Sequence, residues 1–447
     1  MNSPSNKSTL RKRVTRYAKV STSMANFGVR AAGQKLLGIS ADRQKQAERL
    51  RIALGALKGP LMKVAQILSS IPDAVPKEYA QELAQLQADA PPMGWPFVRR
   101  RMLAELGADW EEKFKTFDHE ACAAASLGQV HRAVAHDGRP LACKLQYPDM
   151  ESAVEADLRQ LKIVLAVFEH YDRAVSTKEV QTEIAERLHE ELDYAREAKH
   201  MRLYRLMHAQ SPNVHIPEPI AELSTNRLLT MTWLDGERMI DVAARGSLTD
   251  RNRVAINMFH AWYTPFYSYG VIHGDPHMGN YTVRKDGGIN LLDYGCIRVF
   301  RPELVRGVIT LYESLRDHRE EQSVEAYKAW GFTKPSKRLV EILNIWAQFV
   351  YAPLLEDKTR PIDETNTGFY GRETANKVHA ELRQIGGVTV PREFVFMDRA
   401  AIGLGAVFLR LNAKINWYRM FQELIQDFDV KMLEKNQRKA LRACGLG

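Results

Sequence analysis

Two polar motifs around residue 280 constrain this chain more than any other feature of its sequence. Residues 273–280 read HGDPHMGN, and residues 291–295 read LLDYG. Within them, Asn280 follows Asp275 by five positions, and Asp293 follows Asn280 by thirteen. Carboxylate and amide oxygens of this kind are ligands that Mg²⁺ accepts in proteins. The two motifs therefore predict a magnesium site.

The spacing of these residues is the one found in the phosphoryl-transfer loops of kinase-like folds. In that chemistry Asp275 orients or deprotonates the attacking hydroxyl, while Asn280 and Asp293 hold the metal ions that bridge the nucleotide phosphates. An Asp-Gly-Gly turn at residues 286–288 predicts a β-hairpin that brings Asn280 and Asp293 together. The alternative is a polar loop and hairpin without chemistry, which would leave the agreement of these parts to chance.

The basic charge of the chain is concentrated at its N-terminus. The chain has 447 residues and a net charge of +9, and residues 1–41 hold eight Lys or Arg and no acid, which leaves 55 basic against 54 acidic residues elsewhere. Such an arm can be a solvated terminus, an import signal, or a segment attracted to an anionic membrane surface. Nucleic-acid binding is not expected, because no basic patch with interleaved aromatic residues follows.

The apolar content of 45% predicts a globular protein with a sizeable core. No apolar run approaches the roughly 18–20 residues of a membrane span. The best candidate, Ala400 to Leu409, is bounded by arginines and is predicted to be a buried helix. The four cysteines lack metal-type spacing and fit reduced thiols in a cytosolic or matrix-like compartment.

Helix and strand signals divide the chain into four predicted parts. Residues 1–40 form a basic, flexible arm, and residues 41–118 form a helical extension interrupted by prolines. Residues 119–235 form a kinase-like N-lobe, and residues 236–447 form a kinase-like C-lobe with C-terminal helices. The predicted fold class is α+β: a protein-kinase-like two-lobe fold with an N-terminal helical extension and extra C-terminal helices.

The predicted N-lobe contains a lysine in a strand that is otherwise apolar. Lys144 lies within residues 141–145, and a buried lysine is costly unless it is paired. We expect it to contact nucleotide phosphates and a helix carboxylate. A second buried strand, at residues 228–234, stands where a kinase hinge would fall, and residues 250–269 predict the helix before the catalytic loop.

One long helix is predicted from Ser176 to Met207, beginning with the capping box STKE. It carries Glu191, Asp193 and Glu197. Asp193 and Glu197 are four positions apart and would share a face, where like charges repel unless a cation or metal lies nearby. Glu191 would point elsewhere, roughly 240° around the helix from Glu197.

The segment before Lys144 carries alanines where a phosphate loop carries glycines. Residues 123–130 read AAASLGQV, so only the third position of the pattern GxGxxGxV is a glycine. Alanine does not freely take positive φ, and its Cβ keeps phosphates at a distance, so we expect a stiffer loop. The residues expected to bind the cofactor here are Ala123, Ala125, Ser126, Gly128, Gln129 and Val130.

Little chain separates the LLDYG motif from the next predicted helix, which begins at Pro302. Protein kinases place a long activation segment ending in Ala-Pro-Glu at this point, and residues 296–301 are too short to be one. Gly274 also replaces the arginine of the protein-kinase His-Arg-Asp. These features favour small-molecule phosphorylation or ATP hydrolysis over protein phosphorylation.

Three features resemble the UbiB (AarF-type) family of atypical kinases, which is linked to ubiquinone biosynthesis. Residues 63–66 read KVAQ and are similar to the family's Lys-x-Gly-Gln signature. Residues 123–129 are similar to its alanine-rich loop, and Glu191-Leu192-Asp193 is similar to its Glu-x-Asp motif. The resemblance covers residues 55–300 with ordered motifs and the C-terminal helices more loosely.

The resemblance implies a role for each matched residue. Lys144 would pair with Glu197 and contact the phosphates. Lys63 would reach towards Glu191 and Asp193 and restrict where a substrate lies. The implied magnesium ligands are Asn280 and Asp293, and the implied catalytic residues are Lys63, Lys144, Glu197 and Asp275.

The resemblance also implies ATP and Mg²⁺ as cofactors, and ATPase activity favoured by membrane lipids and quinone-precursor-like phenols. The expected partners are therefore ATP, lipids, such phenols and quinone-biosynthesis enzymes. The expected location is cytoplasmic and peripheral, at the inner face of a membrane, or the mitochondrial matrix in a eukaryote.

Four positions depart from the family pattern without removing a phosphate or metal ligand: Ala65, Thr232, Met278 and Tyr294. Two alternatives stay open. An aminoglycoside- or choline-type phosphotransferase also reads His-Gly-Asp-x-His in its catalytic loop, although the KVAQ motif and the alanine-rich loop disfavour it. A nucleotide-gated scaffold with little turnover is the other.

Overall fold

The computed structural model describes residues 93–125, 127–156, 158, 159, 162, 177–364, 371–385 and 391–447. The basic arm, Lys63, Ser126 and Ser176 lie outside the described residues. The chain divides into two compact units. The first holds the described residues up to Gly138 with Ala142–Asp193 and Asn226–Leu228, and the second holds Arg139–Leu141, Tyr194–Thr225 and Leu229–Gly447.

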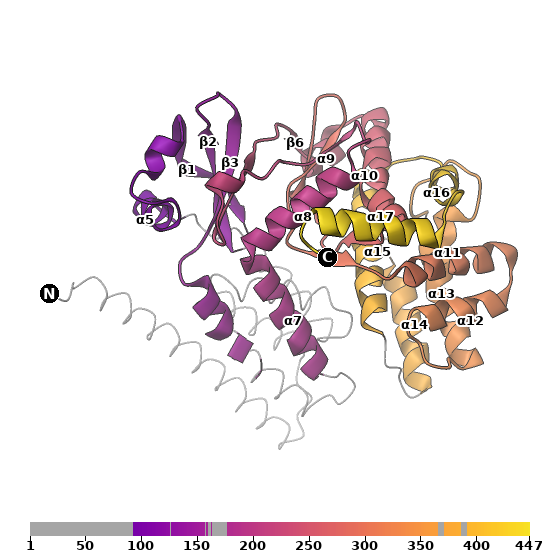
Figure 1. Ribbon diagram of the computed structural model, residues 1–447. Helices are drawn as coiled ribbons and strands as arrows, with labels where there is room; N and C mark the ends of the chain where they lie inside the picture. The colour runs from indigo at the N-terminus through magenta and orange to yellow at the C-terminus, as the bar shows by residue number, and fades with distance from the viewer. Residues whose placement is uncertain are drawn as a thin grey trace, which may run out of the picture. The chain divides into compact units, whose positions relative to one another are not determined.

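The first unit is built on three strands, β1 (Thr116–Ala125), β2 (Gly128–Val134) and β3 (Pro140–Gln146). Helix α5 (Trp95–Leu106) and the short η2 (Trp110–Lys113) lie beside them (Figure 1). β1 and β2 form an antiparallel hairpin, in which Ala123 pairs with Val130 and Ala125 with Gly128. The first part of the alanine-rich segment is thus strand, not loop, and the strand begins three residues earlier than the predicted lobe.

The sheet has the strand order β1-β2-β3-β5, with β5 at Leu228–Thr232. Backbone hydrogen bonds tie β3 to the chain around β5 at both ends. The Gln146 N–H donates to the Arg227 carbonyl at 3.0 Å, and the Trp233 N–H donates to the Pro140 carbonyl at 2.9 Å. The two strands predicted from apolar runs are confirmed.

The prediction of one helix from Ser176 to Met207 is wrong. The described chain forms α7 (Thr177–Leu192) and α8 (Tyr194–Met207), and Asp193 lies between them outside both helices. Asp193 stands directly before α8, a position where aspartate is favoured because it can satisfy exposed N–H groups. Asp193 and Glu197 therefore do not share a face of one continuous helix.

The second unit contains the motifs around residue 280. Helix α10 (Leu248–Tyr269) starts with a capping box between Ser247 and Asp250. It leads into β7 (Val271–His273), which pairs antiparallel with β10 (Ile297–Val299). A small sheet has the order β4-β9-β8-β6. Its strands are β4 (Val214–His215), β6 (Glu237–Arg238), β8 (Tyr281–Val283) and β9 (Ile289–Leu291).

The predicted hairpin is confirmed, with β8 and β9 antiparallel and Gly287 at φ +84° in the turn. That positive φ explains why glycine stands there. Three short elements complete this region: η3 (Ala221–Leu223), α9 (Met239–Arg245) and η4 (Met278–Asn280).

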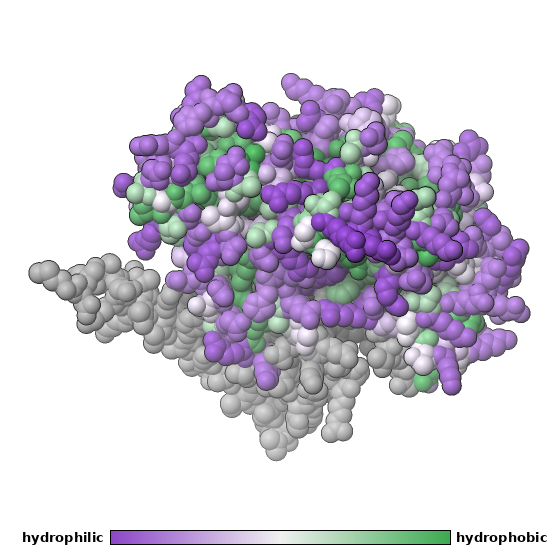
Figure 2. Space-filling model, viewed as in Figure 1, coloured by the Kyte–Doolittle hydropathy of each residue, from purple (hydrophilic) through white to green (hydrophobic). Residues whose placement is uncertain are grey.

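Helices make up the remainder of the second unit: α11 (Pro302–Asp317), α12 (Glu320–Ala329), α13 (Lys337–Tyr351), η5 (Ala352–Leu354), α14 (Arg372–Gln384), α15 (Arg392–Leu411), α16 (Trp417–Ile425) and α17 (Val430–Ala443). The helix predicted at residues 400–409 is part of α15. Helix α17 buries Leu433 and Ala440 and shows a hydrophilic outer face in Figure 2. Within the described ranges, no helix is both long and apolar enough to cross a membrane.

Candidate active site

His273 links the two polar motifs, residues 273–280 and 291–295. It ends β7 and is 1% exposed. Its Nδ1 accepts a hydrogen bond from the Asp275 N–H at 3.2 Å, and its Nε2 donates to the Asp293 carbonyl at 2.7 Å. One acceptor and one donor fix the neutral Nε2–H tautomer. The imidazole thus positions the backbone of both aspartates.

Gly274 allows the loop to lie directly against the start of β10. Its N–H donates to the Cys296 carbonyl at 2.6 Å. A Cβ at this position would lie 2.6 Å from Cys296 Sγ and 3.2 Å from that carbonyl. An arginine, as in His-Arg-Asp, does not fit beside Cys296 without a shift of the strand.

Asn280 is fixed by bonds at both its backbone and its side chain. Its Nδ2 donates to the Asp275 carbonyl at 3.1 Å, and its carbonyl accepts from the Leu292 N–H at 3.0 Å. Because the amide nitrogen faces Asp275, the amide oxygen points away from that carbonyl, which leaves it suited to bind a cation. Its loop is completed by η4, in which the Gly279 N–H donates to His277 Nδ1 at 3.1 Å and the Asn280 N–H donates to the His277 carbonyl at 2.9 Å.

The turn after β9 orients Asp293. One carboxylate oxygen of Asp293 accepts from the Gly295 N–H at 3.1 Å. Tyr294 is fully buried, and its hydroxyl donates to the Leu291 carbonyl at 2.9 Å. Tyrosine is therefore accommodated where phenylalanine is common, because the hydroxyl has a partner.

Helix α8 contributes two buried polar residues to this region. Glu197 is 2% exposed, and His200 Nδ1 donates to the Tyr294 carbonyl at 3.1 Å. The charge of Glu197 is among the causes that raise the pKa of Tyr294, after burial, Tyr204, Asp293 and Tyr281. Glu197 is thus within electrostatic reach of the LLDYG turn. His200 was not among the predicted site residues.

Three buried tyrosines lie near Asp275 and Asp293. Burial raises the pKa of Tyr204, Tyr281 and Tyr294, and the charge of Asp275 raises that of Tyr281 further. The rings of Tyr204 and Tyr294 meet edge to face at 5.3 Å. The phenols therefore stay neutral at physiological pH and add no charge beside the carboxylates.

The first unit carries the other predicted site residues that the structure describes: Ala123, Ala125, Gly128, Gln129, Val130, Lys144, Glu191 and Asp193. Lys144 lies on β3 and is 8% exposed. Ala123 and Ala125 lie on β1, the exposed strand of the hairpin, while Gly128 and Gln129 are buried on β2.

The side chain of Gln129 is fully buried and bonded within the protein. Its Oε1 accepts from the Met93 N–H at 2.7 Å, and its Nε2 donates to the Met93 carbonyl at 3.1 Å and to His131 Nε2 at 2.8 Å. His131 Nδ1 in turn donates to the Asp118 carbonyl at 2.8 Å. The Gln129 side chain thus holds the backbone of Met93, which lies in the predicted helical extension. Its part in cofactor binding stays a prediction.

The second unit brings together Glu197, Asp275, Asn280 and Asp293, whereas Lys144, Glu191 and Asp193 belong to the first. Among the described residues, no group of three or more His, Cys, Asp or Glu could hold a metal ion. The oxygens of Asp293 and Asn280 form a donor set of the kind that Mg²⁺ accepts alongside water and phosphate oxygens.

A profile of the ABC1 atypical kinase-like domain matches residues 85–327. The chain belongs to the ABC1 atypical kinase-like family. The predicted family is confirmed, because AarF-type and COQ8-type kinases are among its relatives. The match includes every described residue that we predicted for the site.

Relatives of this ABC1 domain occur in plants and fungi. A chloroplastic aarF domain-containing protein kinase of Arabidopsis thaliana is 32% identical over 65% of this chain and 42% of its own length. The mitochondrial atypical kinase COQ8 of Saccharomyces cerevisiae is 24% identical over 84% of this chain and 75% of its own. This chain thus spans less than half of the plant relative.

A solved structure of Rv3197 with erythromycin, from Mycobacterium tuberculosis, is similar with a TM-score of 0.61 and 26% identity. The match covers 86% of this chain and 96% of the Rv3197 chain. Together with the family match, this similarity confirms the predicted α+β, protein-kinase-like fold class with its helical C-terminal region.

Proposed function

We propose that this ABC1-family chain is a Mg²⁺- and ATP-dependent atypical kinase or ATPase that supports quinone-lipid synthesis at a membrane surface. Asp275 would accept the proton of the attacking hydroxyl or water, and Asn280 and Asp293 would hold the metal. Lys144, paired with Glu197, would contact the phosphates, and bound Mg²⁺ would supply charge neutralisation there.

The observation that carries this proposal is the double hydrogen bond of His273, which ties the backbone of Asp275 to that of Asp293. Catalysis of phosphoryl transfer depends mainly on positioning and on electrostatic stabilisation. A loop in which both aspartates and Asn280 are bonded to a buried framework meets the first need before any ligand binds.

The segment after Gly295 supports a small acceptor or water over a protein substrate. Residues 297–299 are strand β10, in register with β7 so that Ile297 pairs with His273, and Pro302 begins α11. A protein substrate normally rests on a long segment at this point. The short chain from Gly295 to Pro302 instead forms the strand that pairs with β7.

The proposed quinone link and location rest on the family. The yeast relative is the mitochondrial atypical kinase COQ8, and the Arabidopsis relative is chloroplastic. We propose a peripheral location at the inner face of a membrane, or in the matrix of a mitochondrion. Lys63 would restrict the substrate region near Glu191 and Asp193.

The test is Mg²⁺-dependent ATP hydrolysis by the full chain, with and without anionic-lipid vesicles, beside Asp293→Asn. We expect hydrolysis that vesicles raise, and a loss of about 100-fold or more in the variant, because a metal ligand is removed. Turnover that depends on an amino-alcohol acceptor and ignores vesicles would favour the phosphotransferase alternative. Tight ATP binding without turnover would favour the scaffold, and absence of ATP binding would refute all three.

A further inference from the structure

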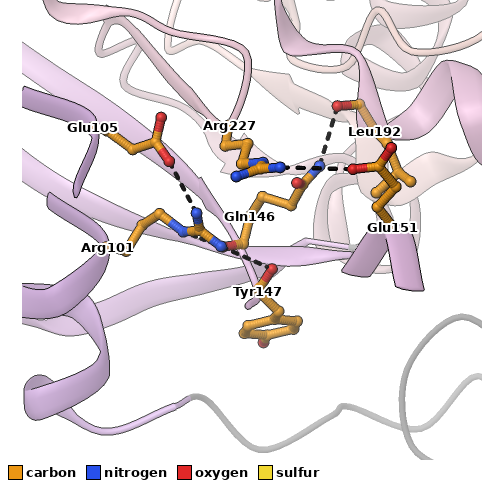
Figure 3. Close-up of polar contacts among 7 residues, drawn as sticks. All are labelled: Arg101, Glu105, Gln146, Tyr147, Glu151, Leu192 and Arg227. Atoms are coloured by element: carbon orange, nitrogen blue, oxygen red, sulfur yellow. Dashed lines mark hydrogen bonds and ion pairs between the residues drawn. The ribbon is translucent and has the colours of Figure 1, made fainter. Parts of the chain in front are cut away.

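Gln146, the last residue of β3, joins three separate elements of the first unit (Figure 3). Its N–H donates to the carbonyl of Arg227, just before β5, at 3.0 Å. Its carbonyl accepts from Arg101 Nε of α5 at 3.2 Å. Its side-chain Nε2 donates to the carbonyl of Leu192, the last residue of α7, at 3.1 Å. The residue is 3% exposed, so these bonds form away from water.

The backbone at the end of β3 is held by a nearly buried ion pair. Arg101 donates through Nε to the Gln146 carbonyl and through Nη2 to the Tyr147 carbonyl, each at 3.2 Å. Its Nη1 bonds Glu105 at 2.9 Å, and the two side chains are 10% and 12% exposed. A guanidinium that is paired and donates twice more to the backbone is a rigid support. The position of Gln146 is therefore fixed independently of α7.

The side chain of Gln146 reaches the Glu-x-Asp motif. The last carbonyls of a helix have no partner within the helix, so a donor at that point stabilises the helix end. Leu192 is flanked by Glu191 and Asp193, and the Asp193 N–H bonds the Glu190 carbonyl at 3.1 Å. Gln146 thus bonds the residue that separates the two motif carboxylates.

Gln146 also shares a strand face with the candidate phosphate-binding lysine. Lys144 is two positions earlier on β3, and alternate residues of a strand point to the same side. The strand that carries Lys144 thereby bonds directly to the end of the helix that carries Glu191 and Asp193. An aliphatic side chain would fill the same space and make no such bond.

We propose that Gln146 is a positioning residue for the nucleotide site: it fixes the Glu191-Leu192-Asp193 end of α7 relative to Lys144. This inference rests on the proposed function, because it assumes that the motif carboxylates act on bound Mg²⁺–nucleotide. Gln146 acts through Leu192 and does not itself touch the ligand.

The test compares Gln146→Met with Gln437→Met in the full chain. Methionine keeps the length of glutamine but cannot donate. Gln437 is the matched control, because its Nε2 donates to the carbonyls of Tyr269 and Phe300, both at 2.8 Å, away from the motif. We expect Gln146→Met to bind Mg²⁺–AMP-PNP about tenfold more weakly by calorimetry, while Gln437→Met binds as the native chain does. Both variants should lower Tm, since Gln146 loses a buried donor and Gln437 a half-buried one.

A double-mutant cycle separates positioning from mere stabilisation. In an Asp193→Asn background, Gln146→Met should weaken nucleotide binding by less than about twofold, because the carboxylate it positions has been removed. Gln146→Asn, which keeps the amide but shortens its reach, should give an intermediate loss and serves if Gln146→Met does not fold.

Two results would separate the failure of this inference from that of the proposed function. If the native chain binds no Mg²⁺–AMP-PNP, the proposed function fails first. If the native chain binds it, and Gln146→Met lowers only Tm or adds fully to Asp193→Asn, Gln146 is a structural residue and the inference is wrong.

Discussion

The two units hold their candidate site residues by different means. In the second unit, the bonds of His273 and Asn280 stay within about two dozen positions of sequence, from β7 to the turn after Asp293. In the first unit, Gln129 and Gln146 make side-chain bonds that reach 36 and 46 positions along the chain. The loop of the second unit is thus held mostly by neighbouring residues, with an added long-range bond from His200 to the Tyr294 carbonyl. The first unit depends more on elements that are far apart in the sequence.

The largest effect on activity should come from removing the two hydrogen bonds of His273. His273→Phe keeps a buried ring and removes both bonds to the aspartate backbones. We expect ATP turnover to fall about 100-fold, because misplacement of reacting groups by even 1 Å is costly. His260→Ala, which removes an imidazole from α10 outside the loop, is the control and should stay within about threefold. A loss below about tenfold for His273→Phe would show that the loop keeps its geometry without the imidazole.

The next effect concerns pH and a buried histidine of the second unit. His208 Nε2 donates to the Ala261 carbonyl at 3.1 Å, and burial lowers its pKa to about 4. The unfolded chain takes a proton near pH 6.5, while the folded chain does not until about pH 4. Stability therefore falls as the pH drops through this window, by about 3 kcal/mol in all.

His208→Gln keeps a donor for Ala261 and removes the titration. Urea unfolding of the native chain and the variant at pH 7, 5.5 and 4 measures the difference. The variant should lose less stability on acidification than the native chain, by about 3 kcal/mol. An equal loss in both proteins would mean that other groups control the acid response.

A smaller effect is expected from removing the long-range bonds of Gln129 in the first unit. Gln129→Leu removes the pair of bonds to Met93 and leaves His131 Nε2 without its donor. We expect local opening around Met93 to become easier by about 2 kcal/mol, or about 30-fold in amide hydrogen exchange. Cys122→Ser, in the exposed strand of the same hairpin, should change the exchange little. If the hydrogen exchange of residues 93–95 is unchanged in Gln129→Leu, the Gln129 side chain does not hold the backbone around Met93 in place.

The smallest effect should come from Tyr294→Phe, which restores the aromatic residue common in Asp-Phe-Gly. It removes one hydrogen bond to Leu291, worth about 1 kcal/mol of stability. Turnover of ATP should change by less than about threefold, because the carboxylate of Asp293 and its bond to Gly295 remain. A larger loss of turnover at unchanged Tm would assign the hydroxyl a part in the site.

Elements that depend on neighbouring residues could be predicted from the sequence. The hairpin around Gly287, the strands that carry Lys144 and Leu229, and the helix starting at Pro302 depend on neighbouring residues, and each is confirmed. The break at Asp193 was missed because the periodicity continues on both sides of it, and a single polar position does not reveal where a helix restarts. The residues before 93 and the roles of the candidate site residues stay predictions.

The side-chain bonds of the first unit could not be predicted from one sequence. Nothing near Gln129 or Gln146 indicates that their partners are Met93 and Leu192, because the pairing exists only once the sheet and helices pack. His273 is different, because both of its partners, Asp275 and Asp293, lie in the two motifs that the sequence already singles out.

The pairing of β10 with β7 has a consequence for inhibitor design. In protein kinases, the packing of the aromatic residue in the Asp-aromatic-Gly turn distinguishes active from inactive states, and a ligand can be designed for either arrangement. Here the chain just past that turn is hydrogen-bonded to Gly274 and His273 is bonded to the turn itself. A compound that needs the turn to move must first break these hydrogen bonds. Ligands that bind the turn in its present conformation are therefore the better starting point for inhibitors.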